Sequence, residues 1–213
     1  MKRGIVILLS IIVCIALTLV FPLFRIVRLE QVAEAKKAAQ FDAESFAMEF
    51  WTEQLSPTFE QATEATELIA AIKQDSDAAR QSFGRSVGIG RVYFYFFHGA
   101  GTITAVEKTG VAVSCTAPED KADLVMKTGL LFGNTVRDAT GQLSASDFAN
   151  SQDFNAVSKE LNRIVEEQVQ PDLRAKAKVD GKIRFVGCAE VRASNKVLLP
   201  LTVIPLQVEF ANE

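Results

Sequence analysis

Histidine and cysteine are scarce in this chain. Among its 213 residues there is one histidine, His98, and there are three cysteines, and no C-x-x-C or H-E-x-x-H motif occurs. Zinc sites need several such ligands at short spacings, and serine or cysteine nucleophiles rely on a histidine base. We therefore predict no metal site, no cofactor and no enzymatic activity. His98 ends an aromatic stretch beside Gly99, which is typical of a packed or hydrogen-bonded strand residue.

Phosphate-binding and calcium-binding loops are also missing. The glycine-containing stretch GIGRVYFYFFHGAG has no lysine where a phosphate-binding loop needs one, and it does not lead from a strand into a helix. The acidic residues of PEDKADL are Glu119, Asp120 and Asp123, and their spacing misses the calcium-loop pattern. They predict a solvated turn.

Positive charge is in short supply beyond the first residues. Lys2, Arg3, Arg25 and Arg28 flank an uncharged run, and without them 19 lysines and arginines face 26 aspartates and glutamates. The resulting net charge of −7 gives the rest of the chain no electrostatic reason to bind nucleic acid or anionic lipid. We predict no nucleic-acid partner.

The uncharged run, residues 4–24, contains 21 residues, enough to cross about 30 Å of hydrocarbon as a helix. A cleaved signal peptide has a shorter apolar region, about 7 to 15 residues, followed by a small-residue cleavage site. Cys14 lies in the middle of the run, but the bulky Val13 before it argues against lipid attachment. We predict an uncleaved, single-pass signal anchor in the bacterial inner membrane. The flanking charges give only a slight orientation preference, and we place the acidic portion outside, in the periplasm.

Residues 29–84 have helical patterns. LEQVAEAKKAAQ predicts a charged stalk, and FDAESFAMEFWTEQL predicts an amphipathic helix. Ser56 and Pro57 predict the N-cap and first position of the next helix. Its apolar stripe would consist of Phe59, Ala62, Ala65, Leu68, Ile69 and Ile72. We thus predict a membrane anchor over 1–28, a helical segment over 29–84 and a β-rich domain over 85–213.

Strand patterns dominate the third region. RVYFYFFHGAGTITAVEKTG predicts one long strand, apolar on both faces and bent at its glycines. Four further strands are predicted in VAVSC, ADLVMKTG, KIRFVGCAEV and VLLPLTVIPLQVEF. A helix that ends near Pro171 would lie between them, with its stripe at Phe154, Val157, Leu161, Ile164 and Val165. The fold class is α+β, with a small OB-like antiparallel β-barrel that contains an inserted helix. Helices packed on one antiparallel sheet are the alternative.

Four blocks of the sequence resemble one family. They are IVRLEQVAEAKKAAQFDAESFAMEFWTEQLSP, GTITAVEKTGVAVS, GLLFGNTVRDATGQLSASDFANSQDFNAVSKELN, and GKIRFVGCAEV with TVIPLQVEF. They are similar to the DUF2291 family of predicted periplasmic lipoproteins. Family members are often found beside sugar ABC-importer genes, so the resemblance implies a role in carbohydrate uptake, but it implies no activity. The family's lipidated cysteine lies just before the motif that reads RIVRLEQ here, where this chain has Phe24. We therefore expect a helix in place of the lipid.

Two classes of function remain open. In the first, the chain is a membrane-anchored extracytoplasmic accessory or scaffold protein that works through protein contacts, with a sugar ABC importer as the expected partner. In the second, it is a binding module that holds a small polar ligand, such as a sugar, at the barrel mouth. A sugar site needs stacking aromatics beside convergent polar groups. Most aromatics here follow the core pattern, so we favour the first class.

The block GLLFGNTVRDATG contains the candidate binding residues, which are Asn134, Thr135, Arg137 and Asp138. The glycines around them permit positive φ and close approach, while amide, hydroxyl and guanidinium groups form directional hydrogen bonds. The alternative is that Arg137 pairs with Asp138 and that the glycines turn the chain toward a helix starting near Ser146.

Cys115 and Cys188 are the only cysteines outside the apolar run. An oxidising compartment permits a disulfide between them, worth about 4 kcal/mol in the chain-entropy model. Strand alternation places Cys115 with Val113 on an apolar face but Cys188 with Glu190 on a mixed face, unless Gly187 hosts a bulge. Both a disulfide and two free thiols are therefore open.

Overall fold

The computed structural model describes Gly4 and residues 41–87, 91–116 and 121–210. Apart from Gly4, the predicted anchor over 4–24 lies outside the described residues, as do the stalk and Cys14. Among the residues that are described, no helix is both long and apolar enough to cross a membrane. The chain divides into two compact units, Met1–Phe41 and Asp42–Glu213, and the second contains every helix and strand discussed below.

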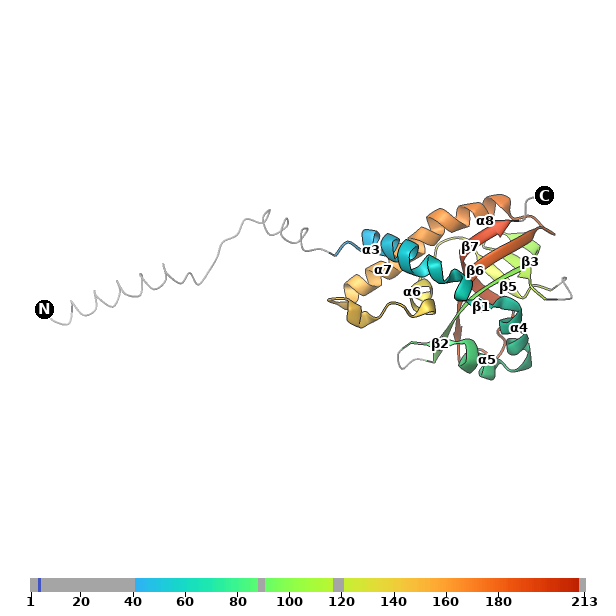
Figure 1. Ribbon diagram of the computed structural model, residues 1–213, viewed down its shortest axis with the longest axis horizontal. Helices are drawn as coiled ribbons and strands as arrows, with labels where there is room; N and C mark the ends of the chain where they lie inside the picture. The colour runs from blue at the N-terminus through green and yellow to red at the C-terminus, as the bar shows by residue number, and fades with distance from the viewer. Residues whose placement is uncertain (1–3, 5–40, 88–90, 117–120, 211–213) are drawn as a thin grey trace. The chain divides into compact units, whose positions relative to one another are not determined.

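Seven strands form one sheet in the described part of the chain (Figure 1). They are β1 Thr63–Glu64, β2 Arg85–Ser86, β3 Val92–Glu107, β4 Gly110–Ser114, β5 Leu124–Lys127, β6 Lys182–Arg192 and β7 Leu201–Phe210. The pairing runs from β3 to β4, β5, β7 and β6, and β6 pairs again with β3. The short β1 and β2 also pair with β3. The five longer strands therefore form a closed circuit of pairings.

The long strand predicted around the glycines is confirmed as β3. It pairs with β6 without interruption over residues 92–102, across both glycines. A Cβ atom at Gly101 would collide with the carbonyl oxygen of Ser114 on β4, so the glycine lets these strands approach. The pairing with β4 skips Thr104, which forms a bulge at this point.

The five predicted strands are all present, but one pairing differs from the prediction. β5 runs parallel to β7, with Leu124 opposite Leu201. The prediction of a fully antiparallel sheet is therefore wrong. Parallel neighbours need a crossover connection, and residues 128–200 provide it through helices and β6.

The first helical segment consists of α3 Ala43–Glu49, the π-helix η1 Phe50–Leu55, the 3-10 helix η2 Ser56–Gln61, α4 Ala65–Gln74 and α5 Ser76–Phe83. The single helix predicted from Ser56 to Ile72 is wrong, because Ala62 is extended at ψ 158° and the next two residues pair with β3 as β1. Pro57 does lie in the first turn of η2. Ser56 is not its N-cap, since the hydroxyl donates to the Trp51 carbonyl at 2.8 Å.

The second helical segment consists of α6 Thr135–Thr140, the 3-10 helix η3 Ala145–Asp147, α7 Ser151–Ile164, the π-helix η4 Val165–Val169 and α8 Gln170–Lys176. Near Ser146 only η3 forms, and α7 begins after Asn150, whose side chain accepts from the Asp153 amide at 2.9 Å. The predicted end near Pro171 is wrong, because helical structure continues to Lys176. Pro171 lies in the first turn of α8, after the wider η4 turn, where a missing N–H is tolerated.

The main core lies between the inner face of the sheet and the neighbouring helices. α4 and α5 lie at one side of the sheet, while α8 lies beside β7 and α3 beside α7 (Figure 1). The predicted stripes are confirmed by the burial of Ala65, Leu68, Ile69 and Ile72 and of Val157, Leu161, Ile164 and Val165. Full burial of one large aliphatic side chain stabilises a fold by about 1.5–3 kcal/mol. The first stripe fixes α4 on the sheet, whereas α7 packs on α3 and α6.

Candidate functional site

The four predicted binding residues lie together at the start of α6. Asn134 is exposed directly before the helix, whereas Thr135, Arg137 and Asp138 are buried. The Thr135 hydroxyl lies 3.3 Å from a carboxylate oxygen of Glu190 on β6. Three of the four predicted residues are therefore buried in the protein rather than presented to solvent.

The Arg137 guanidinium is engaged on all sides. Its Nε and Nη2 donate to the Asp138 carboxylate at 2.7 and 3.2 Å. Its Nη1 donates to the Phe154 carbonyl at 3.3 Å, and the guanidinium carbon lies 3.5 Å from the Phe154 ring centroid. These contacts match the alternative in which Arg137 pairs with Asp138 locally. A binding role for this group stays a prediction.

Both described cysteines are free thiols. Cys188 is fully buried although it keeps its place on the predicted mixed face, and α6 packs on β6. The bulge opposite Gly187 lies at Leu206 of β7 and does not reverse the faces of β6. Burial, together with the neighbouring Asp123 carboxylate, raises the pKa of the Cys115 thiol to about 12. Burial also raises the pKa of the Cys188 thiol. Neither thiol is poised as a nucleophile at neutral pH.

The predicted acidic turn is only partly described, since Glu119 and Asp120 lie outside the described residues. Asp123 is buried rather than solvated, with 4% of its surface exposed. Its carboxylate accepts the backbone N–H groups of Cys115 and Thr116 at 2.9 and 2.8 Å. Lys73 adds an ion pair at 3.0 Å. The solvated-turn prediction is wrong for Asp123, which instead ties the end of β4 to α4.

The segment 129–133, which we call the strap, runs along the helices α7, η4 and α8. The Gln170 side chain accepts the Gly129 N–H at 2.8 Å and donates to its carbonyl at 3.0 Å. The Glu166 carboxylate accepts the Leu131 N–H at 2.6 Å. The Asn162 amide donates to the Gly133 carbonyl at 3.1 Å. Three helical side chains, four residues apart, thus hold every second residue of the strap.

This ladder of hydrogen bonds leaves two large apolar side chains in solvent. Leu130 and Phe132 are 71% and 76% exposed, while Leu131 between them is 6% exposed. We call Leu130 and Phe132 the apolar ridge. Beside it lies a groove of about 520 Å³. Its polar lining includes Asn134, Asn155, Ser158, Lys159, Asn162, Arg163 and Glu166.

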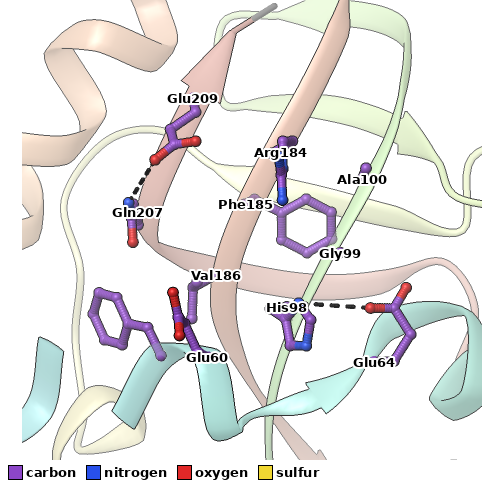
Figure 2. Close-up of a pocket in the computed structure, with 11 residues that line it drawn as sticks. Glu60, Glu64, His98, Gly99, Ala100, Arg184, Phe185, Val186, Gln207 and Glu209 are labelled. Atoms are coloured by element: carbon purple, nitrogen blue, oxygen red, sulfur yellow. Dashed lines mark hydrogen bonds and ion pairs between the residues drawn. The ribbon is translucent and has the colours of Figure 1, made fainter. Parts of the chain in front are cut away.

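A second hollow, the polar pocket, lies on the outer face of β3, β6 and β7 (Figure 2). It has a volume of about 500 Å³. His98 is in register with Glu64 of β1, and its Nδ1 lies 3.5 Å from a Glu64 carboxylate oxygen. Arg184 is in register with Glu209 across β6 and β7. Figure 2 shows these pairs on adjoining strands of one open, polar surface.

The polar pocket carries more carboxylates than cations. Glu60, Glu64 and Glu209 face one permanent cation, Arg184, which has no ion-pair partner within the described ranges. Gln207 donates to Glu209 at 2.9 Å. Within the described residues no group of three or more histidine, cysteine or acidic side chains is placed to hold a metal ion. The pocket offers hydrogen-bond donors and acceptors for a small polar molecule.

Sequence reasoning missed both hollows. GLLFG was read as a turn, although its apolar residues between two glycines could have indicated an extended strap with one buried and two exposed side chains. In the polar pocket, Gln207 and Glu209 alternate along one strand, and this alternation could have predicted that both lie on the outer face of the sheet. The positions of Glu60 and Glu64 could not be predicted in this way, because the sequence placed both on the single helix from Ser56 to Ile72, which does not form.

These features define an α+β domain built on an OB-like sheet. The chain is similar to the crystal structure of an OB-fold protein from Thermotoga maritima, with a TM-score of 0.73 and 27% sequence identity. That alignment covers 81% of this chain and 99% of the other. No curated protein matches the chain.

The family follows from the sequence as a whole. The family model of DUF2291, described as a predicted periplasmic lipoprotein, matches residues 13–209. The chain therefore belongs to the DUF2291 family. This confirms the resemblance and supports a periplasmic location.

Proposed function

We propose that this protein is a membrane-tethered extracytoplasmic accessory or scaffold protein that works by contacting another protein. The family description supports the extracytoplasmic location. Among the described features, the apolar ridge supports the contact function best. Partner proteins recognise large side chains that a rigid frame presents to solvent.

The single observation that carries this proposal is the ladder under the ridge. Flexible loops often expose an isolated apolar side chain without consequence. Here, however, buried Gln170, half-buried Glu166 and buried Asn162 fix the strap backbone and thereby fix the outward direction of Leu130 and Phe132. A surface that is held in place binds with a smaller loss of conformational entropy than a mobile one.

The tether in this proposal is the apolar helix over 4–24. Its length and its lack of charge support it. Lipid attachment at Cys14 is the competing tether, and the family description and the start of the family match at residue 13 favour it. Val13 disfavours it, because the bulky side chain directly before Cys14 hinders processing. A sugar ABC importer is the partner we propose, on the ground of the family resemblance alone.

Site-specific photo-crosslinking in intact cells tests the contact function. A photoreactive phenylalanine analogue replaces Phe132 in one variant and Val197 in a control variant, since Val197 is also apolar and is 82% exposed. We expect a discrete crosslinked adduct with one membrane protein from position 132 and none from position 197. Absence of an adduct at position 132, or equal adducts at both positions, contradicts the proposal.

A second candidate function is the binding of a small polar ligand, such as a sugar, in the polar pocket. The observation that favours it is the unpaired Arg184 beside three carboxylates and an amide on one sheet face. Ligand-observed NMR with a panel of monosaccharides tests it. Saturation transfer that is lost in Arg184→Ala would support this function, and an absence of transfer for the whole panel would exclude monosaccharides as ligands.

A further inference from the structure

The ladder beneath the strap has a regular geometry. Asn162, Glu166 and Gln170 are four residues apart on the helices and bind strap residues that are two apart. Four helical residues advance by about 6 Å, and two extended residues advance by about 6.6 Å. The helix side chains and an extended backbone therefore stay in register along the helix axis.

The next position of this ladder, Ser158, has no backbone to bind. The strap ends at Gly133, and the chain turns away into α6 at Thr135. The Ser158 hydroxyl is buried without a hydrogen-bond partner, and Asn162 Oδ1 is also unpartnered, because only its Nδ2 is used on Gly133. Both residues are 5% exposed and both line the groove. Buried polar groups of this kind are costly unless something satisfies them.

We propose that the groove binds an extended segment of a partner protein, which continues the ladder where the strap leaves it. This inference rests on the proposed function and names the mode of contact at the same ridge. A backbone N–H of the partner donates to Asn162 Oδ1, and the Ser158 hydroxyl donates to a partner carbonyl. An apolar side chain of the segment packs against Phe132 and Leu130. The strap itself shows that this helix face binds the main-chain groups of a segment that runs along it.

Charge complementarity adds a basic residue to the partner segment. Arg163 lies at the groove but already contacts three carboxylates, those of Glu44, Glu160 and Glu167, at 2.7, 2.6 and 2.9 Å. With Glu166, four carboxylates lie in or beside the groove against the two cations Lys159 and Arg163. The partner segment therefore carries a lysine or arginine next to its apolar residue, at the Arg163 end.

A library of random short peptides displayed on phage, selected on the full chain in phospholipid nanodiscs, tests this mode. We expect the selected peptides to share an apolar residue beside a basic one. Synthetic peptides are then titrated by fluorescence anisotropy against wild type, Phe132→Ala, Ser158→Ala and the control Val197→Ala. Phe132→Ala should raise the Kd at least about tenfold, and Val197→Ala should leave it unchanged.

Ser158→Ala separates a binding role from a structural one. The hydroxyl has no partner in the folded protein, and alanine is the better helix former, so thermal stability should stay equal or rise. The Kd for the peptide should nevertheless rise about fivefold. Methylating the peptide N–H that faces Asn162 should abolish binding to wild type.

The outcomes distinguish this inference from the proposed function. Failure to select any peptide, or peptides that bind Phe132→Ala as well as wild type, overturns the inference. Full affinity of Ser158→Ala and of the methylated peptide also overturns it, while crosslinking at position 132 would then still support docking at the ridge. If the peptides bind with all the expected losses of affinity but no crosslink forms in cells, the inference about the groove is supported. The proposed function is then contradicted.

Discussion

At the scale of single residues, Arg137 decides whether the start of α6 is a binding site or part of the architecture. Its charge is 4% exposed and is balanced by the buried Asp138 carboxylate. Arg137→Ala would leave that carboxylate buried and unpaired. We expect a loss of about 3–5 kcal/mol in the free energy of unfolding, measured by urea denaturation.

Arg184→Ala is the matched control for this prediction. Arg184 is exposed and has no ion-pair partner in the parts of the chain that are described. Its removal should change the free energy of unfolding by no more than about 0.5 kcal/mol. If Arg137→Ala behaves like this control but abolishes partner association, Arg137 belongs to a binding site after all.

Asp123 makes stability depend on pH. Burial by itself would raise the pKa of its carboxyl, but hydrogen bonds from Lys73, Cys115 and Thr116 outweigh burial and lower the pKa below 3.8. A lowered folded-state pKa contributes stability that is complete above 3.8 and is lost as pH falls through the folded value. We expect Asp123→Asn to cost about 1–3 kcal/mol at pH 7. The difference from wild type should shrink in acid, measured by urea denaturation from pH 7 to pH 3, and a constant difference contradicts the assignment.

Local chemistry made part of the site predictable at this scale. Arg137 and Asp138 are neighbours in sequence, and an ion pair between them was one of two readings. The unpartnered Ser158 was not predictable, because its isolation depends on where a distant strap turns away. The burial of Asp123 likewise depends on Lys73, which lies on another element.

At the scale of elements, apolar periodicity predicted most helices and strands, and long-range pairing overruled it at particular points. The stripe from Ala65 to Ile72 lies on the core as expected. The same periodicity suggested that Phe59 and Ala62 continue this helix. The residues that follow Ala62 instead form a parallel pair with Phe97 and His98, a contact that no local pattern reveals.

The strap provides a test at the element scale. Glu166→Ala removes the acceptor for the Leu131 N–H, so this amide should exchange with deuterium about tenfold faster, measured by NMR-detected hydrogen exchange. The control is Glu167→Ala, because Glu167 is exposed and does not contact the strap. Unchanged protection of the Leu131 amide in Glu166→Ala would mean that packing of the Leu131 side chain, not the ladder, holds the strap.

At the scale of the whole molecule, the sequence predicted the fold class and the set of long strands but not how they pair. The parallel β5 and β7 pairing follows from a crossover that carries helices and β6. The polar pocket is assembled from η2, β1, β3, β6 and β7, so its residues meet only once the whole sheet is formed. The apolar ridge, by contrast, lies within one short stretch of sequence. It could have been predicted if that stretch had been interpreted as a strap rather than as a turn.

The way in which the whole molecule is tethered to the membrane can be tested directly. We predict that the mature protein keeps residues 1–24 and carries no lipid on Cys14, because Val13 hinders processing and the apolar run is long enough to span the bilayer. Intact-mass analysis of protein extracted from membranes should give the unprocessed chain. Cys14→Ser serves as the control, because it cannot carry the lipid, and its intact mass should equal that of wild type apart from the substitution itself. Loss of the first 13 residues together with an added diacylglycerol mass would contradict the prediction and establish lipid anchoring.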